Sequence, residues 1–234
     1  MRLRELNKYV AGLLKDLNFE EALARIGQEP PGRMVKALFS CLCSCDEQIK
    51  WYAVSGMGQV VADLARDDME NARVVMRRFM WMLNDESGGI GWGIPEAMAE
   101  VMARHQQMAG EYAHMLVAFM REDGFYLELL PLQRGLMWGL GRLAATNQEN
   151  RNLLLGKDVA LYLQPYLRSS DPVVRGLAAR AAGFLMDQGL LAGLHGIVDD
   201  HCPLTVYDNG KFIAGQVGEL ARKSLQMIEK QQAM

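Results

Sequence analysis

Three closely spaced cysteines are the first residues of this chain whose types could do chemistry. Cys41, Cys43 and Cys45 are separated by single residues near the expected end of a helix. Residues two apart face different sides of a helix, so three thiolates could share one ion only if that helix unwound. Zinc sites commonly use two pairs of closely spaced ligands, and this triplet has no second set of partners. We therefore expect ordinary thiols here.

The segment Asp199-Asp200-His201-Cys202 also places hard and soft metal ligands together. Adjacent side chains rarely reach one ion unless a loop folds around it, and His195 would be a further ligand. A solvated loop before a hairpin is the favoured interpretation. The sequence also shows no nucleophile–base pair, no carboxylate pair at a convincing spacing and no cofactor motif. We predict no catalytic residues, no metal and no cofactor.

A glycine-rich turn over residues 88–96 is the most unusual local feature. It leads into a helix that begins near Pro95, and a helix N-terminus offers free N–H groups to an anion. Trp92 could anchor a partner protein, as aromatic residues do at interfaces. The alternative is structural: the glycines would permit a tight turn and Trp92 would pack into the core. The acidic residues near the turn are Asp85, Glu86 and Glu96. We expect them and Trp92 to form a binding surface.

The elements that position these residues are indicated by an internal repeat. The segments Asp46–Gly58 and Asp171–Gly183 share an Asp, an aliphatic residue before a cation, an Ala and a final small-x-Gly. Asp can cap a helix, and the following Pro172 suits the first helical position. The apolar positions recur at the spacing of one helix face. The final small residues would let a neighbouring helix approach closely.

Weaker copies of the segment lie over residues 87–99 and 132–141, and a doubtful last copy begins near Asp208. The positions equivalent to the cation are Lys50, Gly91, Gln133, Arg175 and Phe212. They recur about every 40 residues, which is typical of an α-solenoid built from helix pairs.

The pattern Asp-Pro-x-Val-Arg-x-x-Ala-x-x-Ala-x-Gly resembles HEAT repeats, including the short HEAT-like units of phycobilisome lyases, over residues 32–200. This resemblance implies an all-α superhelix of the HEAT-like or armadillo type. It also implies that the cation at Lys50 and Arg175 bonds a capping Asp of the adjoining unit, with ligand binding as the alternative. Through residues 83–96 and 206–210 the chain is similar to uncharacterised HEAT-repeat proteins of anaerobic bacteria.

The chain is expected to form one domain over residues 1–234. The residues around Asn209-Gly210 predict a small hairpin over 202–214 that caps the last repeat, since Asn-Gly favours a type I′ turn. A terminal helix is expected over 215–231. The preceding helices are predicted over 2–17, 18–26, 33–44, 46–65, 68–83, 94–108, 110–121, 131–145, 147–155, 158–168, 171–187 and 189–198.

Composition narrows the function. The chain has 234 residues, a net charge of −3 and a balance of apolar and charged residues typical of a folded protein. The acidic balance disfavours nucleic-acid binding, and the absence of a long apolar stretch disfavours a membrane span. With no signal-peptide core at the N-terminus, we expect a cytoplasmic protein. The sequence specifies no oligomeric state.

We predict a non-catalytic scaffold that binds another protein. Its contacts would be the turn residues together with Lys50 and Arg175. The alternative is a HEAT-fold enzyme or a metalloenzyme-maturation factor, because phycobilisome lyases and HEAT-like alkylpurine DNA glycosylases show that the architecture can host chemistry.

Overall fold

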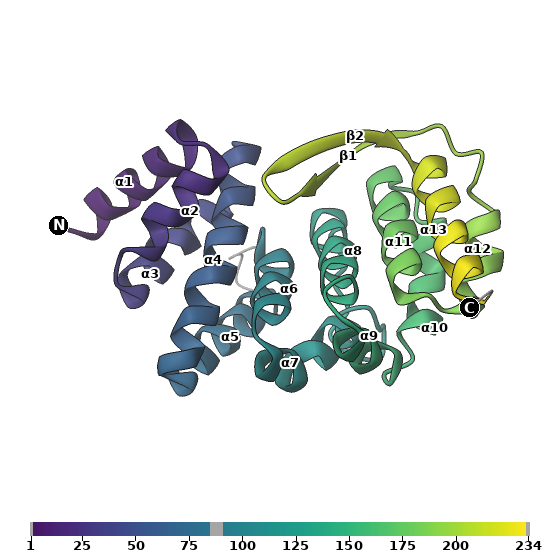
Figure 1. Cartoon of the computed structure of the whole chain (residues 1–234), viewed down its shortest axis with the longest axis horizontal. Coiled ribbons are helices and arrows are strands. Elements are labelled where there is room, and N and C mark those ends of the chain that lie inside the picture. The colour runs from purple at the N-terminus through teal and green to yellow at the C-terminus, as the bar shows by residue number, and fades with distance from the viewer. Residues whose placement is uncertain (1, 85–90, 233–234) are drawn as a thin grey trace. The chain divides into compact units, whose positions relative to one another are not determined.

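The computed structural model describes residues 2–84 and 91–232, which form two compact units, Met1–Met108 and Ala109–Met234. Figure 1 shows the helices of both units, coloured from purple at the N-terminus to yellow at the C-terminus. The expectation of one domain over residues 1–234 stays a prediction. In the part of the chain that the structure describes, no helix has the length and apolar character needed to cross a membrane.

The first unit is a set of packed helices centred on α4 (Glu47–Asp67), which packs against α2, α3, α5 and α6. Asp46 caps α4 by accepting the backbone N–H groups of Gln48 and Ile49, as the repeat predicted. The other helices are α1 (Leu3–Asp16), α2 (Phe19–Gly27), α3 (Pro31–Leu42), α5 (Met69–Leu83) and α6 (Ile94–Arg104). The boundary between the units falls within α7 (Gln106–Ala118).

The second unit is centred on α11 (Pro172–Leu185), which packs between α8 (Leu130–Ala144) and α13 (Val217–Gln232) (Figure 1). Pro172 begins α11 and Asp171 caps it through the N–H of Val174. The shorter elements are α9 (Gln148–Leu155), α10 (Val159–Leu163), the 3-10 helix η1 (Gln164–Arg168), η2 (Gln188–Leu190) and α12 (Leu191–His195).

The last glycine of each strong repeat copy allows close helix packing, as predicted. A Cβ atom on Gly58 of α4 would lie 2.3 Å from Cγ of Glu100 in α6. A Cβ atom on Gly183 of α11 would lie 2.9 Å from Cα of Ser224 in α13. Both positions therefore require glycine because the neighbouring helix occupies the space of a side chain.

The predicted hairpin is present as β1 (Pro203–Asp208) and β2 (Lys211–Gln216), which pair antiparallel. Asn209 and Gly210 have φ values of 44° and 80°, the positive angles of a tight two-residue turn. The hairpin lies along α11 and reaches α8, where Trp138 Nε1 donates to the carbonyl of Tyr207 at 2.8 Å. The hairpin does not cover the exposed face of the last repeat helix by itself, because the following helix α13 packs on α11.

For two of the weaker copies the predicted equivalent of Lys50 is wrong, because that residue is not the fourth residue of a helix. Gly91 precedes α6, whose fourth residue is Ala97, and Phe212 lies in β2. The register is right in α8 and α11, where Gln133 and Arg175 are the fourth helical residues. The last copy does carry Asp208 four residues before Phe212, but Asp208 ends β1 and the residues after it form the hairpin instead of a helix.

Candidate functional site

The predicted turn residues are placed only in part. Asp85 and Glu86 lie outside the described residues. Trp92 is half-buried just before α6. Gly93 caps this helix with a φ of 73°, and a Cβ atom there would lie 2.9 Å from the carbonyl oxygen of Leu42. The turn therefore needs glycine for close packing against the end of α3.

The structure brings Lys50 and Glu96 together inside the first unit. Their Nζ and Oε1 atoms are 3.4 Å apart, and only 3% of the Glu96 side chain is exposed. Burial raises the pKa of Glu96, while the charge of Lys50 opposes this shift. The second carboxylate oxygen, Oε2, is also buried and has no hydrogen-bond partner among the described residues. Glu96 thus joins α4 to α6, and its role toward a partner stays a prediction.

Arg175 also joins elements within its own unit. Its Nε and Nη2 atoms lie 2.9 and 2.7 Å from Oδ2 of Asp200, and Nη1 donates to the carbonyls of Ser169 and Ser170. Asp200 in turn accepts the N–H of Cys202 at 2.9 Å. This network fixes the loop that leads into β1.

The candidate metal ligands do not assemble. Across residues 2–84 and 91–232, no three His, Cys, Asp or Glu side chains are grouped to hold an ion. Cys41 is buried, and burial raises the pKa of its thiol to about 11, so the thiol is protonated at neutral pH. Cys43 and Cys45 are exposed.

A cation that the sequence analysis missed makes the expected inter-repeat bond. Arg134 of α8 places its Nε atom 3.2 Å from both carboxylate oxygens of Asp171, the cap of α11. Burial acts to raise the pKa of Asp171, but Arg134 and the N–H of Val174 outweigh it and lower this pKa. The HEAT resemblance implied such a bond from the cation's repeat position. In α8 that repeat position is occupied by Gln133, and the following residue, Arg134, makes the bond instead.

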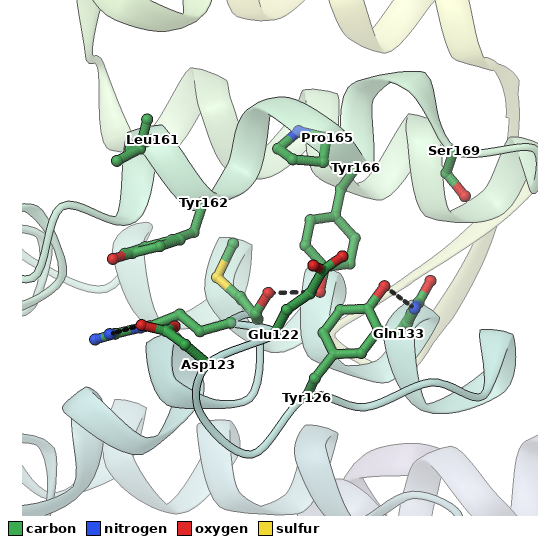
Figure 2. Close-up of a pocket in the computed structure, with 11 residues that line it drawn as sticks. Glu122, Asp123, Tyr126, Gln133, Leu161, Tyr162, Pro165, Tyr166 and Ser169 are labelled. Atoms are coloured by element: carbon green, nitrogen blue, oxygen red, sulfur yellow. Dashed lines mark hydrogen bonds and ion pairs between the residues drawn. The ribbon is translucent and has the colours of Figure 1, made fainter.

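A hollow in the second unit has a volume of about 570 Å³. We call it the tyrosine pocket, after Tyr126, Tyr162 and Tyr166, which line it (Figure 2). Tyr126 comes from the loop between α7 and α8, whereas Tyr162 lies in α10 and Tyr166 in η1. The pocket therefore joins one repeat's loop to the next repeat's helices.

Buried hydrogen bonds hold the inner side of this pocket. Tyr166 is 5% exposed, and its hydroxyl donates to the carbonyl of Met120 at 3.3 Å. Burial raises the pKa of Tyr166, and the neighbouring Tyr126 and Glu122 raise it further. Gln133 Nε2 donates to the Tyr126 hydroxyl at 3.1 Å and to the Leu127 carbonyl at 2.9 Å. The rings of Tyr126 and Tyr166 are thus each held in place by a hydrogen bond.

Two charged side chains, Arg121 and Asp123, form one wall of the tyrosine pocket. Arg121 holds Asp123 through two hydrogen bonds, Nε to Oδ1 at 2.9 Å and Nη2 to Oδ2 at 2.7 Å. These bonds lower the pKa of Asp123. The Arg121 guanidinium also lies 5.1 Å from the centre of the Tyr162 ring. The wall is therefore an ordered ion pair stacked against an aromatic ring.

The outer edge of the pocket is apolar and exposed. Leu161 lines the pocket and is 67% exposed. Phe125, which directly precedes Tyr126 in the sequence, is 53% exposed. Backbone bonds from Phe125 N–H to the Ala118 carbonyl and from Leu127 N–H to the Phe119 carbonyl hold the loop against α7. Leu161 therefore gives the pocket an exposed apolar edge.

Neither a protein-family model nor a curated protein sequence matches this chain. Solved structures do match. An engineered protein from a structural genomics consortium is 16% identical, with 98% of each chain covered and a TM-score of 0.56. A computationally designed armadillo repeat protein for modular peptide recognition is 17% identical, with 94% of this chain and 98% of that chain covered and a TM-score of 0.52.

A designed armadillo repeat protein in complex with the peptide (KR)4 is 15% identical, with 96% of this chain and 99% of that chain covered and a TM-score of 0.55. At these identities the likeness shows the fold alone. The predicted fold class is confirmed: the chain has an all-α, helical-repeat fold of the armadillo type with a small C-terminal hairpin.

Proposed function

We propose that this chain is a protein-interaction scaffold that binds a segment of another protein in the tyrosine pocket. The observation that carries the proposal is the pocket itself, a hollow of about 570 Å³ lined by Tyr126, Tyr162 and Tyr166 and edged by exposed Leu161. Its volume falls within the roughly 300–1,000 Å³ typical of ligand sites.

The residue types favour a protein partner. Tyrosine is enriched at protein interfaces because its ring supplies a large contact area while its hydroxyl stays hydrated or bonded. The hollow also accommodates aliphatic contacts through Leu161 and Pro165. The fold supports the same conclusion, since two of the similar solved structures are designed to recognise or hold peptides.

The pocket is ordered before any partner arrives. Gln133 fixes Tyr126, the Met120 carbonyl fixes Tyr166, and the Arg121–Asp123 pair fixes the charged wall. Binding to such a surface loses little conformational entropy on the scaffold side, so more of the contact energy appears as affinity.

The turn before α6 is proposed as a second contact surface. Trp92 is half-buried, so part of its ring remains accessible, whereas Glu96 and Lys50 pair inside the unit. Trp92 is therefore the described residue of the predicted set that is best suited to touch a partner directly.

A selection from a phage-displayed library of random short peptides tests the proposal on the full chain. We expect enriched peptides to lose affinity at least about tenfold on Leu161→Ser and on Tyr162→Ala, because these variants remove apolar and aromatic contact area from the lining of the pocket. Trp81→Ala is the matched control, since Trp81 lies in α5 of the first unit and is 66% exposed. If no peptide is enriched, or if the enriched peptides bind the pocket variants as well as the wild type, the proposal is wrong.

A further inference from the structure

The charges that line the tyrosine pocket do not cancel. The lining contains one cation, Arg121, and two carboxylates, Glu122 and Asp123. Arg121 and Asp123 are bonded to each other by two hydrogen bonds. Among residues 2–84 and 91–232, no hydrogen bond or ion pair engages Glu122. One negative charge of the pocket therefore has no counter-ion in the described part of the chain.

The unpaired carboxylate is directed toward the aromatic side chains. In Figure 2 the Glu122 side chain points toward Tyr166, above the ring of Tyr126. The charge of Glu122 also contributes to the raised pKa of Tyr166. A group that entered the hollow between these rings would meet the carboxylate.

This arrangement suits a cation. A guanidinium or ammonium group gains charge-assisted hydrogen bonds from a carboxylate and further attraction from the faces of aromatic rings. The methylene stem of such a side chain would pack on Leu161 and Pro165 at the pocket edge. An anion is disfavoured because Glu122 would repel it while the only cation of the lining, Arg121, is already bonded to Asp123.

We infer that the tyrosine pocket selects a basic side chain, arginine or lysine, of the bound segment, with Glu122 as its counter-ion. The inference rests on the proposed function and adds the chemistry of the residue that enters the pocket. Arg121 and Asp123 form the wall and position Tyr162, and they make no ion pair with the incoming cation.

A titration with small probes tests this selectivity without any flanking residues. N-acetyl-arginine amide and its uncharged analogue N-acetyl-citrulline amide are titrated into the full chain, and the ring signals of Tyr126 and Tyr162 are followed by NMR. We expect the arginine probe to shift these signals and the citrulline probe to bind about tenfold more weakly or not at all, because it lacks the charge. Added salt weakens binding of the arginine probe, since the pocket is open to solvent.

Two variants assign the effect to one carboxylate. Glu122→Gln keeps the shape of the side chain and removes its charge, and we expect it to weaken binding of the arginine probe about tenfold. Glu128→Gln is the matched control, because Glu128 is an exposed carboxylate of the same loop that does not line the pocket. Equal binding of the two probes, no binding of the arginine probe, or equal effects of the two variants would overturn the inference.

The two proposals can fail separately. Library peptides that depend on Leu161 and Tyr162 but carry no basic residue, and that bind Glu122→Gln normally, would overturn the charge selectivity and leave the scaffold function standing.

Discussion

The side-chain amide of Gln133 in α8 donates a hydrogen bond to the hydroxyl of Tyr126 at 3.1 Å. The same nitrogen bonds the carbonyl of Leu127 at 2.9 Å. One buried residue of a repeat helix thus holds the loop that forms one side of the tyrosine pocket. The repeat position that carries a cation in α4 and α11 carries a loop-fixing amide in α8.

Replacing Gln133 with leucine tests how much this amide contributes to stability. The variant leaves the Leu127 carbonyl without its partner, and we expect the free energy of unfolding to fall by about 1–3 kcal/mol. Urea denaturation measures this change. Gln148→Leu is the control, because Gln148 is exposed on α9. Equal stability of the Gln133 variant and the wild type would contradict the role assigned to this amide.

The bond between Arg134 and Asp171 predicts a pH-dependent contribution to stability. The pKa of Asp171 is lowered in the folded chain, so its stabilising effect is present above the ordinary aspartate pKa of about 4 and is lost as the pH falls through the folded pKa. We expect Asp171→Asn to be destabilised at neutral pH and to approach the wild type in acid. Unfolding measured across this range checks the prediction, and a gap that stays constant with pH would refute it.

The close approach of α13 to α11 predicts a strict requirement for glycine. A Cβ atom at position 183 would lie 2.9 Å from the Cα atom of Ser224, so the helices must separate to admit it. We expect Gly183→Ala to lower the free energy of unfolding by about 1–3 kcal/mol. Gly110→Ala is the matched control, since nothing lies within 4 Å of a Cβ atom there. We expect that control to be neutral or slightly stabilising in thermal denaturation, and similar losses in both variants would argue against the steric account.

The pair Lys50–Glu96 predicts a pH dependence of stability opposite in sign to that of Asp171. Lys50→Met leaves the Glu96 carboxylate buried without its cation, which costs about 3–5 kcal/mol when the carboxylate is ionised. The folded-state pKa of Glu96 is raised, so the variant is most stable at low pH and loses stability as the pH rises through that pKa. Denaturation of Lys50→Met over a pH series measures the slope. The double variant Lys50→Met/Glu96→Leu should lose this slope, and persistence of the slope would assign it to another group.

Several features of the fold follow from local sequence. Asp46 and Asp171 signal helix starts because an aspartate carboxylate satisfies free N–H groups. Gly58 and Gly183 signal close helix contacts, and Asn209-Gly210 signals a tight hairpin turn. The helix starts and the hairpin turn depend on residues near one another in the chain, and the two glycines stand at matching positions of the repeat, so a pattern in the sequence is enough to predict these features.

The tyrosine pocket depends on residues that the sequence keeps apart. Tyr162 and Tyr166 are one helical turn apart and could have been read as a pair on one face. Tyr126 reaches them only because the α7–α8 loop folds toward the next repeat, and no local pattern reports that approach. The burial of Glu96 was missed for the same reason, since the neighbouring helix α4 that covers it lies earlier in the chain.

Amide hydrogen exchange of the full chain, with and without peptides selected from the random library, tests the scaffold proposal most directly. The account predicts that bound peptide slows exchange in the loop over residues 119–127 and in the segment 159–168, where the pocket residues lie. It predicts no such protection in Leu161→Ser. Protection confined to residues 46–84 or 91–104, with the pocket segments unchanged, would show that the chain binds its partners elsewhere and would contradict the account.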